Sequence, residues 1–185
     1  GIELDPKIAP VLMRVIHTTA DFDYLENLKF SDNAVDTALR VLESGAYIVT
    51  DTNMALSGIN KTALKKLGCE AFCYMADPDV AAAAKENGVT RACASVEKAA
   101  RLEGKPLILV SGNAPTFLIR ARELMDSGEL SPALVIAMPV GFVNVVQSKE
   151  LIISSGAEYI AARGRKGGSN AAASVVNALM YMLTR

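Results

Sequence analysis

The chain has 185 residues, enough for one domain with a sizeable core, and 51% of them are hydrophobic. Nineteen basic and twenty acidic residues leave a net charge of −1, without the basic excess typical of a nucleic-acid-binding protein. The longest apolar stretches are too short to span a membrane, and no secretion signal is recognisable. Cys69, Cys73 and Cys93 lack the spacing of a disulfide framework, which favours a cytoplasmic location, and with a single histidine they make a poor metal site.

The hydrophobic pattern alternates between a helical period and short, continuous apolar runs that are typical of buried strands. Two predicted helices end directly before a glycine, Gly45 and Gly88, which is a usual helix-stop signal. In chain order the pattern predicts helices over Pro6–Ala20 and Asp32–Ser44, strands over Tyr47–Thr50 and Ala71–Met75, a helix over Asp79–Asn87, a strand over Leu107–Val110, a helix over Pro115–Asp126, a strand over Leu134–Met138, a helix over Val145–Ser155, a strand over Glu158–Ala162 and a helix from Ser169 to the C-terminus.

Alternating strands and helices with short joints predict an α/β fold with right-handed crossovers. We expect residues 1–185 to form a single three-layer domain: a five-stranded, mainly parallel sheet with helices on both faces, doubly wound and flavodoxin-like. Ligands of such sheets bind outside the carboxyl ends of the strands. The segments that follow the strands are rich in Gly, Pro, Asn and Ser, although ordinary turn chemistry explains any one of them equally well. They are Thr50–Asn53, Ala76–Pro78, Ser111–Pro115, Pro139–Phe142 and Arg163–Asn170.

His17 is the chain's single histidine and a candidate general acid or base. It falls beside the apolar stripe of the first predicted helix, so a surface or boundary histidine without catalytic role is the plain alternative. Arg91 is a candidate for bidentate capture of a carboxylate. A surface ion pair is the alternative interpretation of this arginine.

The segment R-G-R-K-G-G-S-N, Arg163–Asn170, holds three cations and three glycines between the last strand and the last helix. Glycines let a backbone approach a ligand closely, and Ser169 is positioned to cap a helix whose first amides favour an anion. The segment therefore predicts a carboxylate- or phosphate-binding loop, with a solvated basic turn as the alternative. A Walker motif is absent, and no G-x-G-x-x-G follows the first strand, which disfavours a nucleotide or flavin module.

Five ordered segments resemble the precorrin-8X methylmutase family, including its cobalt-precorrin-8 branch. They are V-I-H-T-T-A-D at Val15–Asp21, T-D-T-N-M-A-L-S-G-I at Thr50–Ile59, S-G-N-A-P-T at Ser111–Thr116, M-P-V-G-F-V-N-V-V-Q-S-K-E at Met138–Glu150, and the Arg163–Asn170 segment. The resemblance covers about residues 10–183. The family's N-terminal stretch, with a Ser-Phe pair and paired isoleucines, is not recognisable before the histidine segment.

The resemblance implies an isomerase of cobalamin biosynthesis that moves the C-11 methyl of precorrin-8X or cobalt-precorrin-8 to C-12, giving hydrogenobyrinate or its cobalt form, cobyrinate. It implies a homodimer, His17 as the acid, and no cofactor or catalytic metal, since any cobalt arrives inside the tetrapyrrole. Carboxylates of the substrate would favour the protonated imidazole. The implied substrate-binding residues are Arg91, Thr52, Asn53, Ser111, Gly112, Asn113, Gly141, Arg163, Gly164, Arg165, Lys166, Gly167, Gly168 and Ser169. The main alternative is a corrinoid-binding protein with little or no turnover, and a structural interaction domain is a further one.

Overall fold

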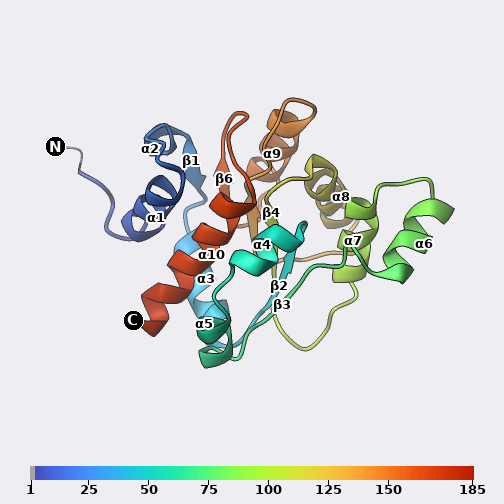
Figure 1. Cartoon of the computed structure of the whole chain (residues 1–185), viewed down its shortest axis with the longest axis horizontal. Coiled ribbons are helices and arrows are strands. Elements are labelled where there is room, and N and C mark those ends of the chain that lie inside the picture. The colour runs from blue at the N-terminus through green and yellow to red at the C-terminus, as the bar shows by residue number, and fades with distance from the viewer. Residues whose placement is uncertain (1–2) are drawn as a thin grey trace.

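Runs of β-branched and other apolar residues form a six-stranded sheet with helices on both faces (Figure 1). The computed structural model describes residues 3–185. The strands are β1 Leu28–Phe30, β2 Tyr47–Thr50, β3 Glu70–Phe72, β4 Leu107–Ser111, β5 Leu134–Ala137 and β6 Tyr159–Ala162. The helices are α1 Ala9–Thr19, α2 Tyr24–Asn27, α3 Ala34–Glu43, α4 Asn53–Gly58, α5 Lys61–Lys66, α6 Pro78–Glu86, α7 Arg91–Ala99, α8 Pro115–Asp126, α9 Val145–Ile153 and α10 Ser169–Thr184.

The strand order is β1-β6-β5-β4-β2-β3, and every pair is parallel except β1 with β6. Without β1, the five parallel strands follow the order of the flavodoxin-like fold, in which β2 and β3 lie on one side of β4, and β5 and β6 on the other. The connection reverses direction between β2 and β4, which are neighbours in the sheet. That switch point is where ligands bind in folds of this kind.

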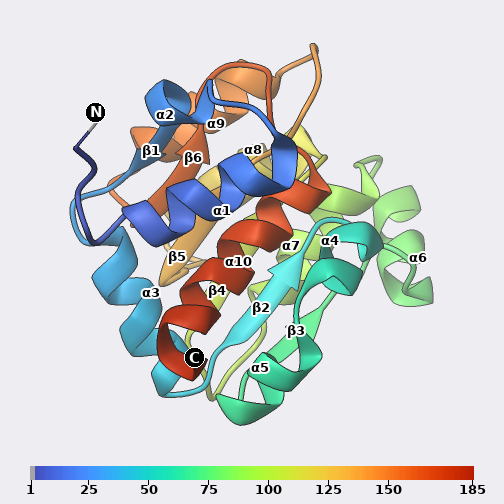
Figure 2. The ribbon, with the colours of Figure 1, turned by 60° about the vertical axis from the view of Figure 1, so that its left-hand side comes forward.

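The sheet separates two apolar cores because successive strand residues point to opposite faces. Ile48 belongs to the core beneath α1, α3, α5 and α10, whereas Val49 belongs to the core beneath α6, α7, α8 and α9. The alanine-rich α10 lies at the centre of the first layer, where it contacts α1, α3, α4 and α5 (Figure 2). Its buried Ala171, Ala172 and Ala173 keep that approach close.

The expected architecture is confirmed, with one strand more than the sequence predicted. The five predicted strands occur at or near their expected positions, and the sixth, β1, is a three-residue antiparallel edge strand. Three residues carry too little alternation for a period to be recognised. The short helices α2, α4 and α5 were also not predicted, because six residues or fewer hold less than two turns of the helical period. Helix α7 was not predicted either, because its buried positions are mostly small residues, Ala92, Ala94, Ser95 and Ala99, rather than a stripe of large apolar ones.

Within residues 3–185 no helix combines the length and apolar character that crossing a bilayer requires.

Candidate active site

Asp51 organises the switch point between β2 and β4. Its buried carboxylate accepts hydrogen bonds from the backbone N–H of Gly112 (2.8 Å), Asn113 (2.8 Å) and Ala114 (2.6 Å), and from Ser111 Oγ (3.0 Å). Burial raises the pKa of this carboxyl group, and the four donors oppose that rise. In a nucleotide-binding relative of this architecture, turn amides at the switch point receive a phosphate. Here the chain's own carboxylate takes them, so the geometry disfavours a nucleotide or flavin module.

The loops that follow the strands pack against one another through glycines. A Cβ on Gly112 would lie 2.6 Å from Ser169 Cα, and a Cβ on Gly167 would collide with the carbonyl oxygens of Met138 and Pro139. The loops after β4, β5 and β6 therefore meet at backbone distance at the carboxyl edge of the sheet. Thr52 Oγ1 also shares a 2.8 Å hydrogen bond with Ser169 Oγ, which adds the loop after β2 to this group.

Ser169 does not cap α10, contrary to the sequence interpretation. The N-cap is Gly168, and Ser169 is the first residue of the helix, with its hydroxyl turned to Thr52. Thr52 is itself the cap of α4, where it accepts a hydrogen bond from Ala55 N. Ser111, Gly112, Gly168 and Ser169 are buried, whereas Asn53 and Asn113 are exposed. The buried members shape the loops, and the exposed asparagines are open to a ligand.

The Arg163–Gly168 loop projects beside the loop that leads into α9, at the top of Figure 1. Arg163 makes two hydrogen bonds to the Glu150 carboxylate, at 2.9 and 3.0 Å. Arg165 lies over the exposed Phe142 ring, 5.8 Å from its centroid, and makes no ion pair with a described residue. Gly141 connects the two loops by donating its N–H to Arg165 O at 3.2 Å.

Lys166 links this loop to the segment that carries His17. Its ammonium lies 2.7 Å from an Asp21 oxygen and 2.8 Å from an Asp23 oxygen, and both aspartates follow the end of α1. These contacts raise the pKa of Lys166 and lower the pKa of Asp21. Figure 2 shows the end of α1 beside the start of α10, next to the same loop. The structure therefore brings His17 and the Arg163–Ser169 segment to one side of the molecule.

His17 lies in the last turn of α1, exposed, while Val11, Leu12 and Val15 on the other side of the helix are buried. It borders two open hollows. One, of about 460 Å³, is lined by Pro10, Met13, Arg14 and His17. The other, of about 550 Å³, is apolar and includes Ile16, Phe22 and Leu25. An exposed imidazole between a hollow with a cation and an apolar one suits a ligand with a broad ring and acidic arms.

Arg14 was not singled out from the sequence. It stands three residues before His17, one helical turn away, and its guanidinium lies 5.3 Å from the Tyr181 ring centroid without an ion pair to a described residue. The three-residue spacing between Arg14 and His17 could be seen in the sequence, but only the structure shows that Arg14 forms no ion pair with a described residue. Arg14 and Arg165 are thus cations of this side that are open to an anionic ligand.

Arg91 is exposed at the first position of α7, and no contact joins it to His17 among the described residues. The preceding Thr90 caps α7 and donates to Thr116 Oγ1 at 3.0 Å. Thr116 belongs to the start of α8, directly after the Ser111–Ala114 turn. Arg91 therefore stands on the α7 side of the carboxyl edge, apart from the α1 side.

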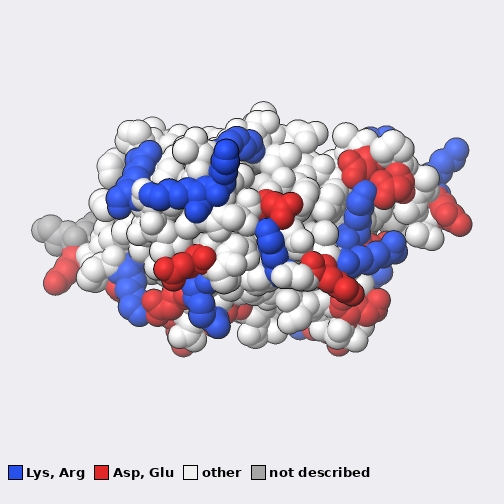
Figure 3. All heavy atoms as spheres, turned by 90° about the horizontal axis from the view of Figure 1, so that it is seen from below, with Lys and Arg blue, Asp and Glu red and all other residues white. Residues whose placement is uncertain are grey.

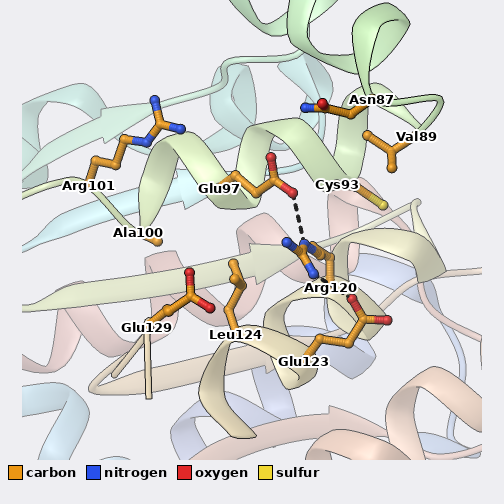
Figure 4. A pocket seen from close by; sticks show the side chains of 10 residues that line it. All are labelled: Asn87, Val89, Cys93, Glu97, Ala100, Arg101, Arg120, Glu123, Leu124 and Glu129. Atoms are coloured by element: carbon orange, nitrogen blue, oxygen red, sulfur yellow. Dashed lines mark hydrogen bonds and ion pairs between the residues drawn. The ribbon is translucent and has the colours of Figure 1, made fainter. Parts of the chain in front are cut away.

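A larger hollow, of about 790 Å³, lies elsewhere, between α7 and α8 (Figure 4). Its central cation, Arg120, is neutralised by Glu97 at 2.9 Å and Glu123 at 2.8 Å. Glu129 adds another carboxylate to the wall. With Arg101 as a second cation, the lining carries three carboxylates and two guanidinium groups. This net charge of −1 does not favour a ligand rich in carboxylates, so size alone does not make it the candidate site.

The face of the molecule seen from below Figure 1 carries basic and acidic side chains close together, with a row of Lys and Arg along part of it (Figure 3). Residues 3–185 contain no group of three or more His, Cys, Asp or Glu arranged to hold a metal ion.

A family model described as precorrin-8X methylmutase matches residues 2–182. The chain belongs to the precorrin-8X methylmutase family. The cobalt-precorrin-8 methylmutase of Salmonella typhimurium is 47% identical over 173 residues, which are 94% of this chain and 80% of that protein. The precorrin-8X methylmutase of Pseudomonas aeruginosa is 38% identical over 182 residues, covering 97% of this chain and 85% of that protein. A solved structure of the precorrin-8x methyl mutase from Thermus thermophilus matches with a TM-score of 0.90 at 37% identity, covering 100% of this chain and 90% of that one.

These matches confirm the family that the five sequence motifs indicated. They also make the chain an isomerase of cobalamin biosynthesis. None of them tests the role of a single residue, so the site assignments stay predictions.

Proposed function

We propose that this methylmutase carries out its methyl shift at the carboxyl edge of the sheet, with His17 as the acid. The observation that carries the proposal is the link between His17 and the basic loop: Asp21 and Asp23, just after α1, bind Lys166 of the Arg163–Ser169 segment. The link gathers an exposed imidazole, an apolar hollow and cations on one side of the molecule.

The chemistry needs one mobile proton. Donation of the His17 proton to the conjugated ring makes the ring electron-poor, and the methyl group migrates with its bonding electrons from C-11 to C-12. The ring then returns a proton, so substrate and product have the same atoms. A positioned general acid contributes about 10²–10⁴-fold to such a rate.

The substrate carries several carboxylates, and cations without ion pairs to described residues suit them. Arg14 shares a hollow with His17, and Arg165 lies in the loop linked to α1. Among the substrate forms we propose cobalt-precorrin-8, because the Salmonella typhimurium relative at 47% identity carries that name and the Pseudomonas aeruginosa relative named for precorrin-8X is 38% identical.

We propose further that the enzyme is a cytoplasmic homodimer. The loop that leads into α9 exposes 85% of Phe142 and 77% of Val143, more apolar surface than a loop normally leaves in water. A second copy covering this loop would lie next to the candidate site. Free thiols at Cys69, Cys73 and Cys93 suit a reducing compartment. Light scattering of the purified protein and of a Phe142→Asp variant tests the dimer, which the variant is expected to weaken.

The test of function is the absorption spectrum of the protein mixed with precorrin-8X and, separately, with cobalt-precorrin-8. We expect conversion by the wild type and by Thr18→Ala, a neighbouring exposed substitution, and loss of conversion with retained binding by His17→Ala. Binding of both forms by the wild type without conversion of either would make the chain a corrinoid-binding protein. Full activity of His17→Ala would remove the acid role.

A further inference from the structure

Lys149 is a lysine of α9 that the proposed chemistry does not use, yet it is completely buried, with 0% of its surface exposed. Its ammonium donates to the carbonyl oxygens of Gly164 at 2.9 Å and Lys166 at 2.7 Å. No carboxylate pairs with it among the described residues. Its contacts are therefore with the backbone of the basic loop.

Burying an ammonium without a counter-ion is unfavourable, and a methionine of similar volume would fill the same space without that cost. The charge of Lys149 therefore indicates that the loop needs a strong donor for the carbonyl groups of Gly164 and Lys166. Two carbonyl groups drawn inward to Lys149 leave the side chains of Arg163, Arg165 and Lys166 directed outward, as their exposure shows.

The contacts continue from the loop to the acid. Lys149 holds the backbone of Lys166, the side chain of Lys166 holds Asp21 and Asp23, and these residues follow the helix turn of His17. One buried side chain is thus connected to both the cationic loop and the end of α1.

We infer that Lys149 is a positioning residue, which fixes the Arg163–Ser169 loop for tetrapyrrole binding and, through Lys166, the place of His17. This inference rests on the proposed function. It assigns to Lys149 no contact with the substrate.

The titration of Lys149 offers a readout that a mere packing role would not produce. Burial lowers its pKa from 10.5 to about 8. The charged groups nearby are paired with other residues: Arg163 with Glu150, Lys166 with Asp21 and Asp23, and Arg122 of α8 with Asp126. Tyr159 of β6 is also nearby and makes no hydrogen bond to the Lys149 nitrogen. Above about pH 8 the amine loses its charge, and its hold on the two carbonyl groups weakens.

The experiment measures binding of cobyrinate and of hydrogenobyrinate in a His17→Ala background, from about pH 6 to about pH 10, so that the imidazole does not contribute. With Lys149 present we expect affinity to fall as the pH rises through about 8. Lys149→Met should bind about tenfold more weakly near neutral pH and show no such fall. The affinity of Lys149→Gln, which keeps a hydrogen-bond donor, should lie between those of the His17→Ala parent and Lys149→Met. Lys85→Met, on the exposed side of α6, should bind as the His17→Ala parent does.

Trypsin provides a readout that needs no tetrapyrrole, because Arg163, Arg165 and Lys166 are cleavage sites within the loop. Lys149→Met should be cut there several times faster while circular dichroism shows an intact fold. Equal corrinoid affinity and an equal pH profile in the proteins with Lys149 and with Lys149→Met would overturn the inference. If the wild type bound neither corrinoid, the proposed function would fail, and trypsin alone would decide: unchanged cleavage would overturn the positioning role, and faster cleavage would support it.

Discussion

Asp51→Asn tests whether one buried carboxylate holds the switch point together. The substitution keeps the shape of the side chain but replaces one of two accepting oxygens with an amide nitrogen. In the less costly orientation the remaining oxygen keeps the three donors of Oδ2, which are Ser111 Oγ and the N–H groups of Asn113 and Ala114. The amide nitrogen then faces the N–H of Gly112, which bonds Oδ1 at 2.8 Å in the wild type.

The loss comprises one hydrogen bond to a charged group, about 1.5–3 kcal/mol, and the weakening of three others. Removing a buried charge offsets part of it, since burial raises the pKa of Asp51. We expect the free energy of unfolding to fall by about 3 kcal/mol, out of a typical total of about 5–15 kcal/mol. Asp51→Ala leaves all four donors without a partner and should cost more.

Urea denaturation followed by circular dichroism measures this change. The matched control is Asp77→Asn, which alters the aspartate directly before α6, paired with Lys98 at 2.7 Å with about a third of each side chain exposed. An exposed pair of this kind contributes about 1 kcal/mol or less. The reasoning is refuted if Asp51→Asn unfolds within 1 kcal/mol of the wild type, about the size of the control effect.

Three further predictions concern the loops. Gly112→Ala and Gly167→Ala should each lower the free energy of unfolding by about 2 kcal/mol or more, because the added Cβ meets backbone atoms. Gly128→Ala has open space around its Cβ and should lose only the backbone strain of its φ of +77°, about 1 kcal/mol. Equal losses at all three sites, measured by urea denaturation, would contradict the close loop packing. The ε-carbon NMR signal of Lys149 should titrate near pH 8. Because the pKa of Lys149 is lower in the folded than in the unfolded chain, its contribution to the free energy of unfolding should rise by about 3 kcal/mol between about pH 8 and pH 10.5. Urea denaturation at these two pH values should show this rise in the wild type and not in Lys149→Met. Lys166→Gln should change the unfolding free energy by less than about 1 kcal/mol, since its pairs are on the surface, yet slow conversion several-fold; unaltered turnover would show that the link to α1 is dispensable.

The sequence supported the architecture because its parallel strands are buried on both faces. Residues such as Leu107–Val110 and Leu134–Ala137 form continuous apolar runs, and glycine marks the ends of several helices. The edge strand β1 escaped notice because its pairing with β6 is a tertiary contact between residues far apart in the chain. Local pattern carries no information on such a partner.

The candidate site divides in the same way. His17 and the Arg163–Ser169 segment could be singled out from residue type, glycine content and resemblance to a family. The roles of Asp51 and Lys149 could not, because a buried aspartate or lysine has the same letter as an exposed one, and only the fold shows which backbone groups it meets. For Ser169 the sequence favoured a helix cap, and the fold gave its hydroxyl a different partner in Thr52.

The most direct test of the site is an amide NMR map of the protein with bound hydrogenobyrinate, whose conjugated ring shifts the signals of nearby nuclei. We predict the largest shifts at His17, Asn53, Asn113, Gly141 and Arg165. The groove between α7 and α8, at Ala100, Arg101 and Glu129, should change little although its volume of about 790 Å³ exceeds that of the two hollows beside His17. Shifts concentrated in that groove, with His17 and the Arg163–Ser169 loop unaffected, would contradict the assignment of the site.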